Sequence, residues 1–181
     1  MEYTASAVIM AVASAEGLLN ELLSGARDER LQSTRWVPMA NVSKDALKKW
    51  SEMWESDPRD SLVDKCHTML EHAGLTPLPR GQGPLQNLEI LISLRNELTH
   101  SKPVYRAHGI SVPRTERDPL ERSLLGKFKS SQLLSDKLPF MWQRCLSAGC
   151  AQWAVSTEIE FRNALFTILG IPIMAEAPEF E

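Results

Sequence analysis

Arg95 and His100 are of the residue types that can cleave a phosphodiester bond without a metal ion. Metal-free RNA cleavage needs a base for the proton of the ribose 2′-hydroxyl, a cation for the charge that builds on the phosphate oxygens, and an acid for the leaving 5′-oxygen. Histidine serves as base or acid near neutral pH. Arginine stays protonated and binds phosphate oxygens through paired hydrogen bonds. Asn96 can orient His100 or bind a phosphate oxygen.

These residues fall at the end of a predicted amphipathic helix. Its apolar residues recur at steps of three and four and are Leu85, Leu88, Leu91, Ile92 and Leu98. Arg95 occupies a position where this stripe would place another leucine, so we expect a carboxylate, a phosphate or water to meet its guanidinium. Pro103 cannot continue a helix and restrains the residue before it, so the helix should end near His100.

The spacing of Arg95 and His100 limits how they can act together. At 100° per residue, two positions five apart lie about 140° apart around a regular helix. The pair can face one small target only if the last turn unwinds before Pro103, or if a second copy of the helix completes the site. Asn96 and His100, four apart, are neighbours on one face.

The run LRNELTH, from Leu94 to His100, resembles the Arg-Asn-x-x-x-His signature of the HEPN superfamily. The N-terminal run AVASAEGLLNELL is similar to the first helix of such domains, and the resemblance covers roughly residues 3 to 170. It implies a helical bundle and a metal-independent endoribonuclease that dimerises so that two motifs line one cleft. Arg95 and His100 would then be catalytic, and the product would end in a 2′,3′-cyclic phosphate.

The first helix is predicted from Tyr3 to Ser24, with Gly25 ending it. Its apolar stripe contains Val8, Val12, Leu19 and Leu23. Glu16 falls on that stripe and has the charge that Arg95 needs, so we expect Glu16 to pair with Arg95 or to hydrogen-bond Asn96. The alternative is that Glu16 lies at the wet edge of the stripe. Asn20, one turn further on, would join the same polar cluster.

The length of 181 residues suits one domain, predicted over residues 1–172 and followed by a disordered acidic tail, 173–181. The net charge is −3, but the segment 95–129 carries eight Lys or Arg against four Asp or Glu. This basic segment would attract a phosphate-bearing partner such as RNA, through Lys102, Arg106 and His108. The alternative is a solvated, charged loop between helices.

Further helices complete a predicted all-α fold, an up-and-down bundle of four or five main helices with short accessory helices. The first begins after Ser43 and runs to Glu55. The second begins at Asp57-Pro58, ends at His72 and is closed by Gly74. A short helix spans Pro119 to Phe128, and the last helices run from Pro139 to Leu169. Trp50 and Trp54 are predicted core residues, and His67 and His72 predicted surface residues.

No metal or other cofactor is expected. Three cysteines without the density of a secreted scaffold favour a reducing cytoplasm. Cys145 and Cys150 are five apart and would diverge on a helix, and Cys66, His67 and His72 are poorly spaced for zinc. The apolar N-terminus lacks the basic residues of an export signal, and no stretch is expected to span a membrane.

Two functions follow as hypotheses. The first is a homodimeric endoribonuclease, a toxin or a defence effector, which an antitoxin or another regulatory protein would neutralise. The second is a helical binding or dimerisation module in which Glu16 and Arg95 form a structural ion pair and His100 only ends a helix, because several HEPN-like domains bind without cleaving.

Overall fold

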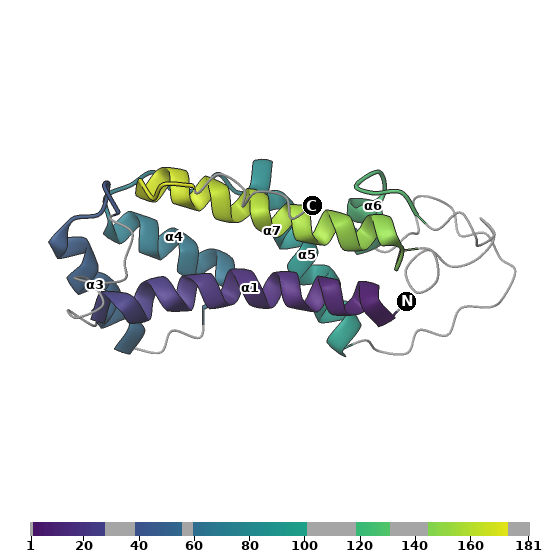
Figure 1. The fold of residues 1–181 in the computed structure, drawn as a ribbon, viewed down its shortest axis with the longest axis horizontal. Coiled ribbons are helices and arrows are strands. Elements are labelled where there is room, and N and C mark those ends of the chain that lie inside the picture. The colour runs from purple at the N-terminus through teal and green to yellow at the C-terminus, as the bar shows by residue number, and fades with distance from the viewer. Residues whose placement is uncertain (1, 28–38, 56–59, 101–118, 131–144, 174–181) are drawn as a thin grey trace, which may run out of the picture. The chain divides into compact units, whose positions relative to one another are not determined.

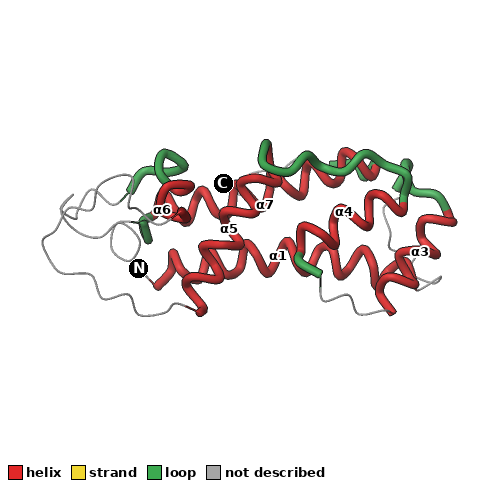
Figure 2. The backbone as a smooth tube through the Cα atoms, turned by 180° about the vertical axis from the view of Figure 1, so that it is seen from behind, coloured by secondary structure: helices red, strands yellow, loops and turns green. Residues whose placement is uncertain are grey.

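The computed structural model describes residues 2–27, 39–55, 60–100, 119–130 and 145–173. The helices labelled in Figure 1 are α1 (Glu2–Arg27), α3 (Lys44–Glu55), α4 (Leu62–His72), α5 (Gly83–His100), α6 (Pro119–Leu124) and α7 (Ala148–Leu169). Within these ranges the remaining backbone is loop and turn, without strands (Figure 2). The prediction of an all-α fold with main and short accessory helices is confirmed.

The chain divides into two compact units. Unit 1 comprises residues 1–14 and 86–159, and unit 2 comprises residues 15–85 and 160–181. Both units are therefore built from segments distant in sequence, and α1, α5 and α7 each contribute residues to both. The single domain over residues 1–172 stays a prediction. The tail beyond Ile173 lies outside the described residues.

The core of unit 2 is apolar and is organised around Trp50 of α3, which is fully buried. The Trp50 indole Nε1 donates to the Met69 carbonyl oxygen of α4 at 2.8 Å, which satisfies the buried indole. Its largest other buried side chains are Leu19, Leu23, Met69, Leu70, Leu85, Phe161 and Leu165. The predicted core position of Trp50 is therefore confirmed, whereas that of Trp54 is wrong, because Trp54 is only half-buried.

Capping residues set where α3 and α4 begin. The Ser43 hydroxyl accepts from the backbone N–H of Ala46 at 3.2 Å, so the predicted cap of α3 is confirmed. The predicted start of the next helix at Pro58 is wrong. Ser61 caps α4 by accepting from the Asp64 N–H at 3.2 Å, and Leu62 is the first helical residue. Gly74, with φ of +70°, follows the end of α4 as predicted.

The start of α7 is fixed within unit 1 by Ser147. Its hydroxyl accepts from the Cys150 N–H at 3.2 Å and donates to the Lys129 carbonyl oxygen at 2.8 Å. The Ser147 carbonyl in turn accepts from the Thr4 hydroxyl of α1 at 3.4 Å. Gly149 allows this close approach, because a Cβ there would lie 2.6 Å from the Lys129 carbonyl oxygen. Ser147 thus joins α1, the segment after α6, and α7.

The helix α1 departs from its prediction in two ways. It continues through Gly25 to Arg27, and Gly25 and Ala26 are buried. Packing of the last turn therefore outweighs the tendency of glycine to end a helix. The expectation that no stretch could span a membrane is also wrong by length and composition, since Tyr3–Arg27 passes that test. A buried stripe that includes Val12 and Leu19 is equally typical of the core helix of a folded domain.

Candidate functional site

The helix α5 buries four leucines at three-residue steps and carries its polar residues toward the C-terminus. The buried leucines are Leu85, Leu88, Leu91 and Leu94, each fully buried. The stripe position expected of Arg95 is therefore taken by Leu94, and Arg95 lies beside it, half-buried. Three residues turn a helix by about 300°, which is about 60° less than a full turn. The buried face therefore shifts around α5 along its length, from the side that carries Ile92 to the side that carries Leu94.

His100 is the last residue of α5, as the position of Pro103 predicts, and its side chain is exposed. Asn96, one turn earlier, is exposed as well. The Thr99 hydroxyl donates to the carbonyl oxygens of Arg95 at 3.0 Å and Asn96 at 3.3 Å, two of the carbonyls near the end of the helix. The last turn is thus helical, and the Thr99 hydroxyl adds hydrogen bonds to carbonyls three and four residues before it.

A regular α5 decides between the two geometries left open by the sequence. With the helix intact through His100, Arg95 and His100 of one chain diverge by about 140°. Unwinding of the last turn does not bring them together in the described α5. The completion of the site by a second copy of the helix end stays a prediction.

The predicted supporting residues on α1, Glu16 and Asn20, are both half-buried and belong to unit 2, whereas Arg95 belongs to unit 1. The pairing of Glu16 with Arg95 or Asn96 stays a prediction. Asn20 accepts a hydrogen bond through its Oδ1 from Lys65 Nζ of α4 at 3.3 Å. Its described partner is thus a lysine of its own unit.

The predicted RNA-binding residues Lys102, Arg106 and His108 lie outside the described residues. From the same basic segment, Lys127 is described in unit 1. Its Nζ donates to Asn87 Oδ1 of α5 at 2.8 Å, which fixes the turn after α6 to the first half of α5. Lys127 therefore supports the helix that carries Arg95 and His100.

Sequence reasoning missed a set of buried polar residues in unit 1. The five described side chains of this kind are Thr4, Glu121, Ser147, Thr157 and Glu158, and all belong to unit 1. The Glu158 carboxylate accepts from the Ser14 hydroxyl of α1 at 3.1 Å. Glu158 follows Ala154 by four residues and precedes Phe161 by three, so its place on the apolar stripe of α7 was the available signal.

The prediction that Cys145 and Cys150 diverge supposed a helix through both, and that premise is wrong. Cys145 precedes α7 and is not helical, while Cys150 lies in its first turn. All three cysteines are free and buried.

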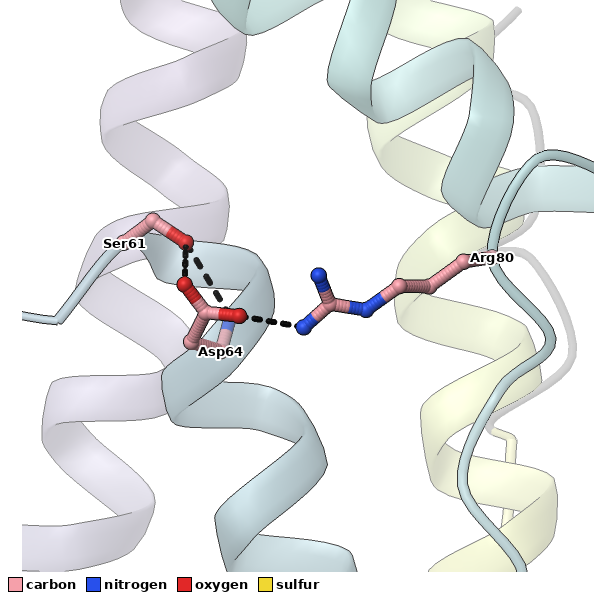
Figure 3. A network of polar contacts seen from close by, with 3 residues as sticks. All are labelled: Ser61, Asp64 and Arg80. Atoms are coloured by element: carbon pink, nitrogen blue, oxygen red, sulfur yellow. Dashed lines mark hydrogen bonds and ion pairs between the residues drawn. The ribbon is translucent and has the colours of Figure 1, made fainter.

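A separate polar network lies on the surface of unit 2 (Figure 3). The Asp64 carboxylate accepts from the Ser61 hydroxyl at 2.6 Å and forms an ion pair with Arg80 of the segment before α5. The hydrogen bonds from Ser61 and Arg80 hold the pKa of Asp64 below its usual value. Exposed ion pairs of this kind stabilise a fold modestly. We infer that the network holds the 75–82 loop against α4.

His67 and His72 of α4 are half-buried, so their prediction as solvated surface residues is wrong. His67 Nε2 and His72 Nδ1 are buried atoms without a hydrogen-bond partner among the described residues. Over the described ranges, no three His, Cys, Asp or Glu side chains are grouped as metal ligands would be. Comparisons of the chain with protein-family models, curated proteins and solved structures gave no match.

Proposed function

We propose that the chain is a metal-independent endoribonuclease that acts as a homodimer, with Arg95 and His100 as its catalytic residues. The observation that carries the proposal is the end of α5, where an exposed histidine and a half-buried arginine, five residues apart, stand on one regular helix. Both residue types are those that metal-free phosphodiester cleavage requires.

A second copy of the chain supplies the Arg95 or His100 side chain that a single helix end cannot bring to the same phosphate. In a two-fold symmetric dimer both copies of each residue can line one cleft, so Arg95 of one chain can face the phosphate beside which His100 of the other acts as a base. Two His100 imidazoles, one neutral and one protonated, would act as base and acid. Arg95 would neutralise the charge on the phosphate oxygens, and Asn96 would orient His100 from the same helix face.

The reaction follows from these roles. His100 of one copy removes the proton of the 2′-hydroxyl, and the 2′-oxygen forms a bond to phosphorus. The bond from phosphorus to the 5′-oxygen breaks, and the second His100 protonates that oxygen. The products are a 2′,3′-cyclic phosphate and a 5′-hydroxyl, and no metal-bound water takes part.

The direct test is cleavage of RNA by the purified full chain in excess chelator. Loss of a general acid or base costs about 10²–10⁴-fold, so His100→Ala should reduce the rate by that factor. Loss of the cation that stabilises the transition state costs about 10²–10³-fold, the reduction expected for Arg95→Ala. His72→Ala is the matched control, since His72 ends α4 as His100 ends α5. Arg162→Ala, another half-buried arginine, controls for Arg95.

Mixing wild-type and His100→Ala chains tests the shared cleft. A mixed dimer has a single His100 and therefore lacks either the base or the acid of the cleft. After random pairing with an equal amount of His100→Ala chain, half of the wild-type chains are in mixed dimers, so the rate should fall to about half of that of the wild-type chain alone. An unchanged rate would show that the residues do not act across a dimer.

The half-burial of Arg95 favours one competing function, a binding module in which Arg95 is structural. Breaking a buried ion pair costs about 3–5 kcal/mol, which would lower the melting temperature of Arg95→Ala strongly. If Arg95→Ala melts like wild type and does not cleave, the residue is catalytic. If wild type and all variants fail to cleave RNA while only Arg95→Ala loses stability, the ribonuclease proposal is wrong.

The biological setting that fits this activity is a toxin or defence effector in the cytoplasm, held inactive by an antitoxin or another regulatory protein. Three cysteines without the density of a secreted scaffold agree with such a compartment. Expression in a bacterial host should arrest growth for wild type and not for His100→Ala. Equal growth with active enzyme in the cells would argue against the toxin role.

A further inference from the structure

Large apolar side chains are exposed on α1 and α7 within unit 1. Of the six such side chains in the described residues, five belong to these two helices and this unit, and they are Tyr3, Ile9, Met10, Val155 and Ile159. Tyr3 is 90% exposed, Met10 66% and Val155 47%. Single exposed apolar residues are common on folded proteins, whereas a group of them on neighbouring elements marks an interaction surface.

The helices α1 and α7 run side by side and in the same direction in this part of unit 1. The Thr4 hydroxyl donates to the Ser147 carbonyl oxygen at 3.4 Å, and the Ser14 hydroxyl donates to Glu158 Oε1 at 3.1 Å. The second contact follows the first by ten residues on α1 and by eleven on the other chain segment. Since a helix rises about 1.5 Å per residue, these contacts hold two nearly equal lengths of about 15 Å against each other.

The exposed faces of the two helices adjoin at the contact between Ser14 and Glu158. On α1, Met10 lies about 40° around the helix from Ser14. On α7, Val155 and Ile159 lie about 60° and 100° from Glu158, both on the same side. Ser14 is itself exposed, so the contact lies at the solvent side of the two helices. The two exposed faces therefore form one surface, which we call the α1–α7 patch.

The α1–α7 patch contains no charged residue. Its exposed residues are Tyr3, Ser6, Ile9, Met10, Ala13 and Ser14 on α1 and Ala148, Gln152, Val155, Ser156 and Ile159 on α7. The segments 3–14 and 148–157 contain no Asp, Glu, Lys or Arg, and Glu158 is buried. In a chain of which 24% of the residues are charged, the patch is distinguished by its lack of charge as well as by its apolar side chains.

We propose that the α1–α7 patch is the surface through which two copies of the chain associate as a two-fold dimer. The homodimer belongs to the proposed function, on which this inference rests, and the inference names the interface. A two-fold axis places the same surface of each copy against the other, so a charge in that surface meets its like. An uncharged apolar patch has the composition that such a self-contact requires at its centre.

The size of the patch suits the centre of a dimer interface. Twelve residues of each helix span about 18 Å, and two helices packed about 9 Å apart are about 20 Å wide with their side chains. The patch therefore covers about 350 Å², against about 800 Å² that each partner buries in a standard interface. The patch supplies the fully buried centre, and the residues around it supply the polar rim.

A lipid surface fits the patch less well than a second copy does. The segment Tyr3–Arg27 is apolar enough, by length and composition, to cross a membrane. Helices that lie on an anionic membrane carry Lys or Arg beside their apolar face. The first such residue is Arg27 in α1 and Arg162 in α7, and both lie outside the patch. A second copy of the chain is therefore the partner that the charge pattern favours.

The test introduces one charge into the patch and measures association of the full chain by sedimentation equilibrium. Met10→Glu and Val155→Glu each place two like charges in the interface of a two-fold dimer, so the dissociation constant should rise at least about 100-fold. Gln86→Glu is the matched control, because it adds the same charge at an exposed position of α5 in the same unit. This control should dimerise as wild type does. Far-UV circular dichroism checks that each variant is folded.

Three outcomes would overturn the proposed interface. The first is a wild-type chain that stays monomeric at every concentration. The second is dimerisation of Met10→Glu and Val155→Glu with the affinity of Gln86→Glu. The third is flotation of the wild-type chain with vesicles of phosphatidylcholine and phosphatidylserine that is lost in Met10→Glu, because this result would assign the patch to lipid.

RNA cleavage in excess chelator separates this inference from the ribonuclease proposal. If wild type cleaves RNA and Met10→Glu and Val155→Glu still dimerise as wild type, the interface is wrong and the ribonuclease proposal stands. If the two charged variants are monomeric while the wild-type dimer does not cleave RNA, the interface stands and the ribonuclease proposal is wrong.

Discussion

Replacement of glycine by alanine should have opposite effects at Gly17 in α1 and Gly149 in α7. Alanine is favoured over glycine inside a helix by about 1 kcal/mol. At Gly17 an added Cβ meets no atom within 4 Å. Gly17→Ala should therefore stabilise the fold by about 0.5–1 kcal/mol.

At Gly149 the added Cβ would lie 2.6 Å from the Lys129 carbonyl oxygen, whereas ordinary contacts begin at 3.4 Å. The Lys129 backbone would have to retreat by about 0.8 Å, the difference between these distances. The retreat stretches the 2.8 Å hydrogen bond from Ser147 beyond hydrogen-bond range. Overpacking costs about 1–3 kcal/mol and the lost hydrogen bond about 1 kcal/mol, which together exceed the helix gain. We expect a net loss of about 1–3 kcal/mol for Gly149→Ala.

Thermal unfolding followed by far-UV circular dichroism measures both effects. For a chain of this size 1 kcal/mol shifts the melting temperature by about 2–4 °C. Gly17→Ala should thus raise the melting temperature by about 1–4 °C, and Gly149→Ala should lower it by about 2–12 °C. A melting temperature that rises in Gly149→Ala as it does in Gly17→Ala would refute the close approach of Lys129 to α7.

Two further predictions concern capping and charge. Ser147→Ala removes a buried hydroxyl with two hydrogen bonds and should lower the free energy of unfolding in urea by about 2 kcal/mol. Ser43→Ala removes an exposed cap and should lower it by about 1 kcal/mol. Equal losses in the two variants would contradict the second hydrogen bond of the Ser147 hydroxyl. Since Ser61 and Arg80 lower the pKa of Asp64 in the folded chain, its stabilising effect is present above the unfolded-state pKa and is lost as pH falls through the folded value. Asp64→Asn should therefore melt below wild type at neutral pH and match it in acid, and a difference that persists in acid would contradict this linkage.

Helix existence and several helix ends followed from local sequence signals. The end of α4 was predicted from Gly74, which follows it and adopts a positive φ of +70°, a conformation that favours glycine. Gly170 follows α7 with the same φ. His100 ends α5 as the nearby Pro103 predicts. Gly25 carried the same signal as Gly74 but lies buried inside α1, because tertiary packing of the last turn outweighed the local preference.

The features that sequence reasoning missed depend on where a helix begins. A divergence of Cys145 and Cys150 required a helix through both, but Ser147 caps α7 between them, so that only Cys150 is helical. Leu94 and Arg95 lie three and four residues after Leu91. A spacing of three and four therefore fits both and could not decide which of them is buried in the core of α5. The structure assigns the buried place to Leu94.

The interior of unit 1 contains buried polar side chains, and Thr157 tests how one of them affects stability. Its side chain is 1% exposed, and its Oγ1 is a buried atom without a hydrogen-bond partner among the described residues. A buried hydroxyl without a partner costs about 1–3 kcal/mol, so the isosteric Thr157→Val should stabilise the chain. Thr4→Val is the matched control, because the Thr4 hydroxyl donates to Ser147 and its loss should destabilise. If Thr157→Val unfolds at a lower urea concentration than wild type, the Thr157 hydroxyl has a hydrogen-bond partner in solution. If Thr157→Val is more stable but cleaves RNA more slowly, the Thr157 hydroxyl belongs to the catalytic site.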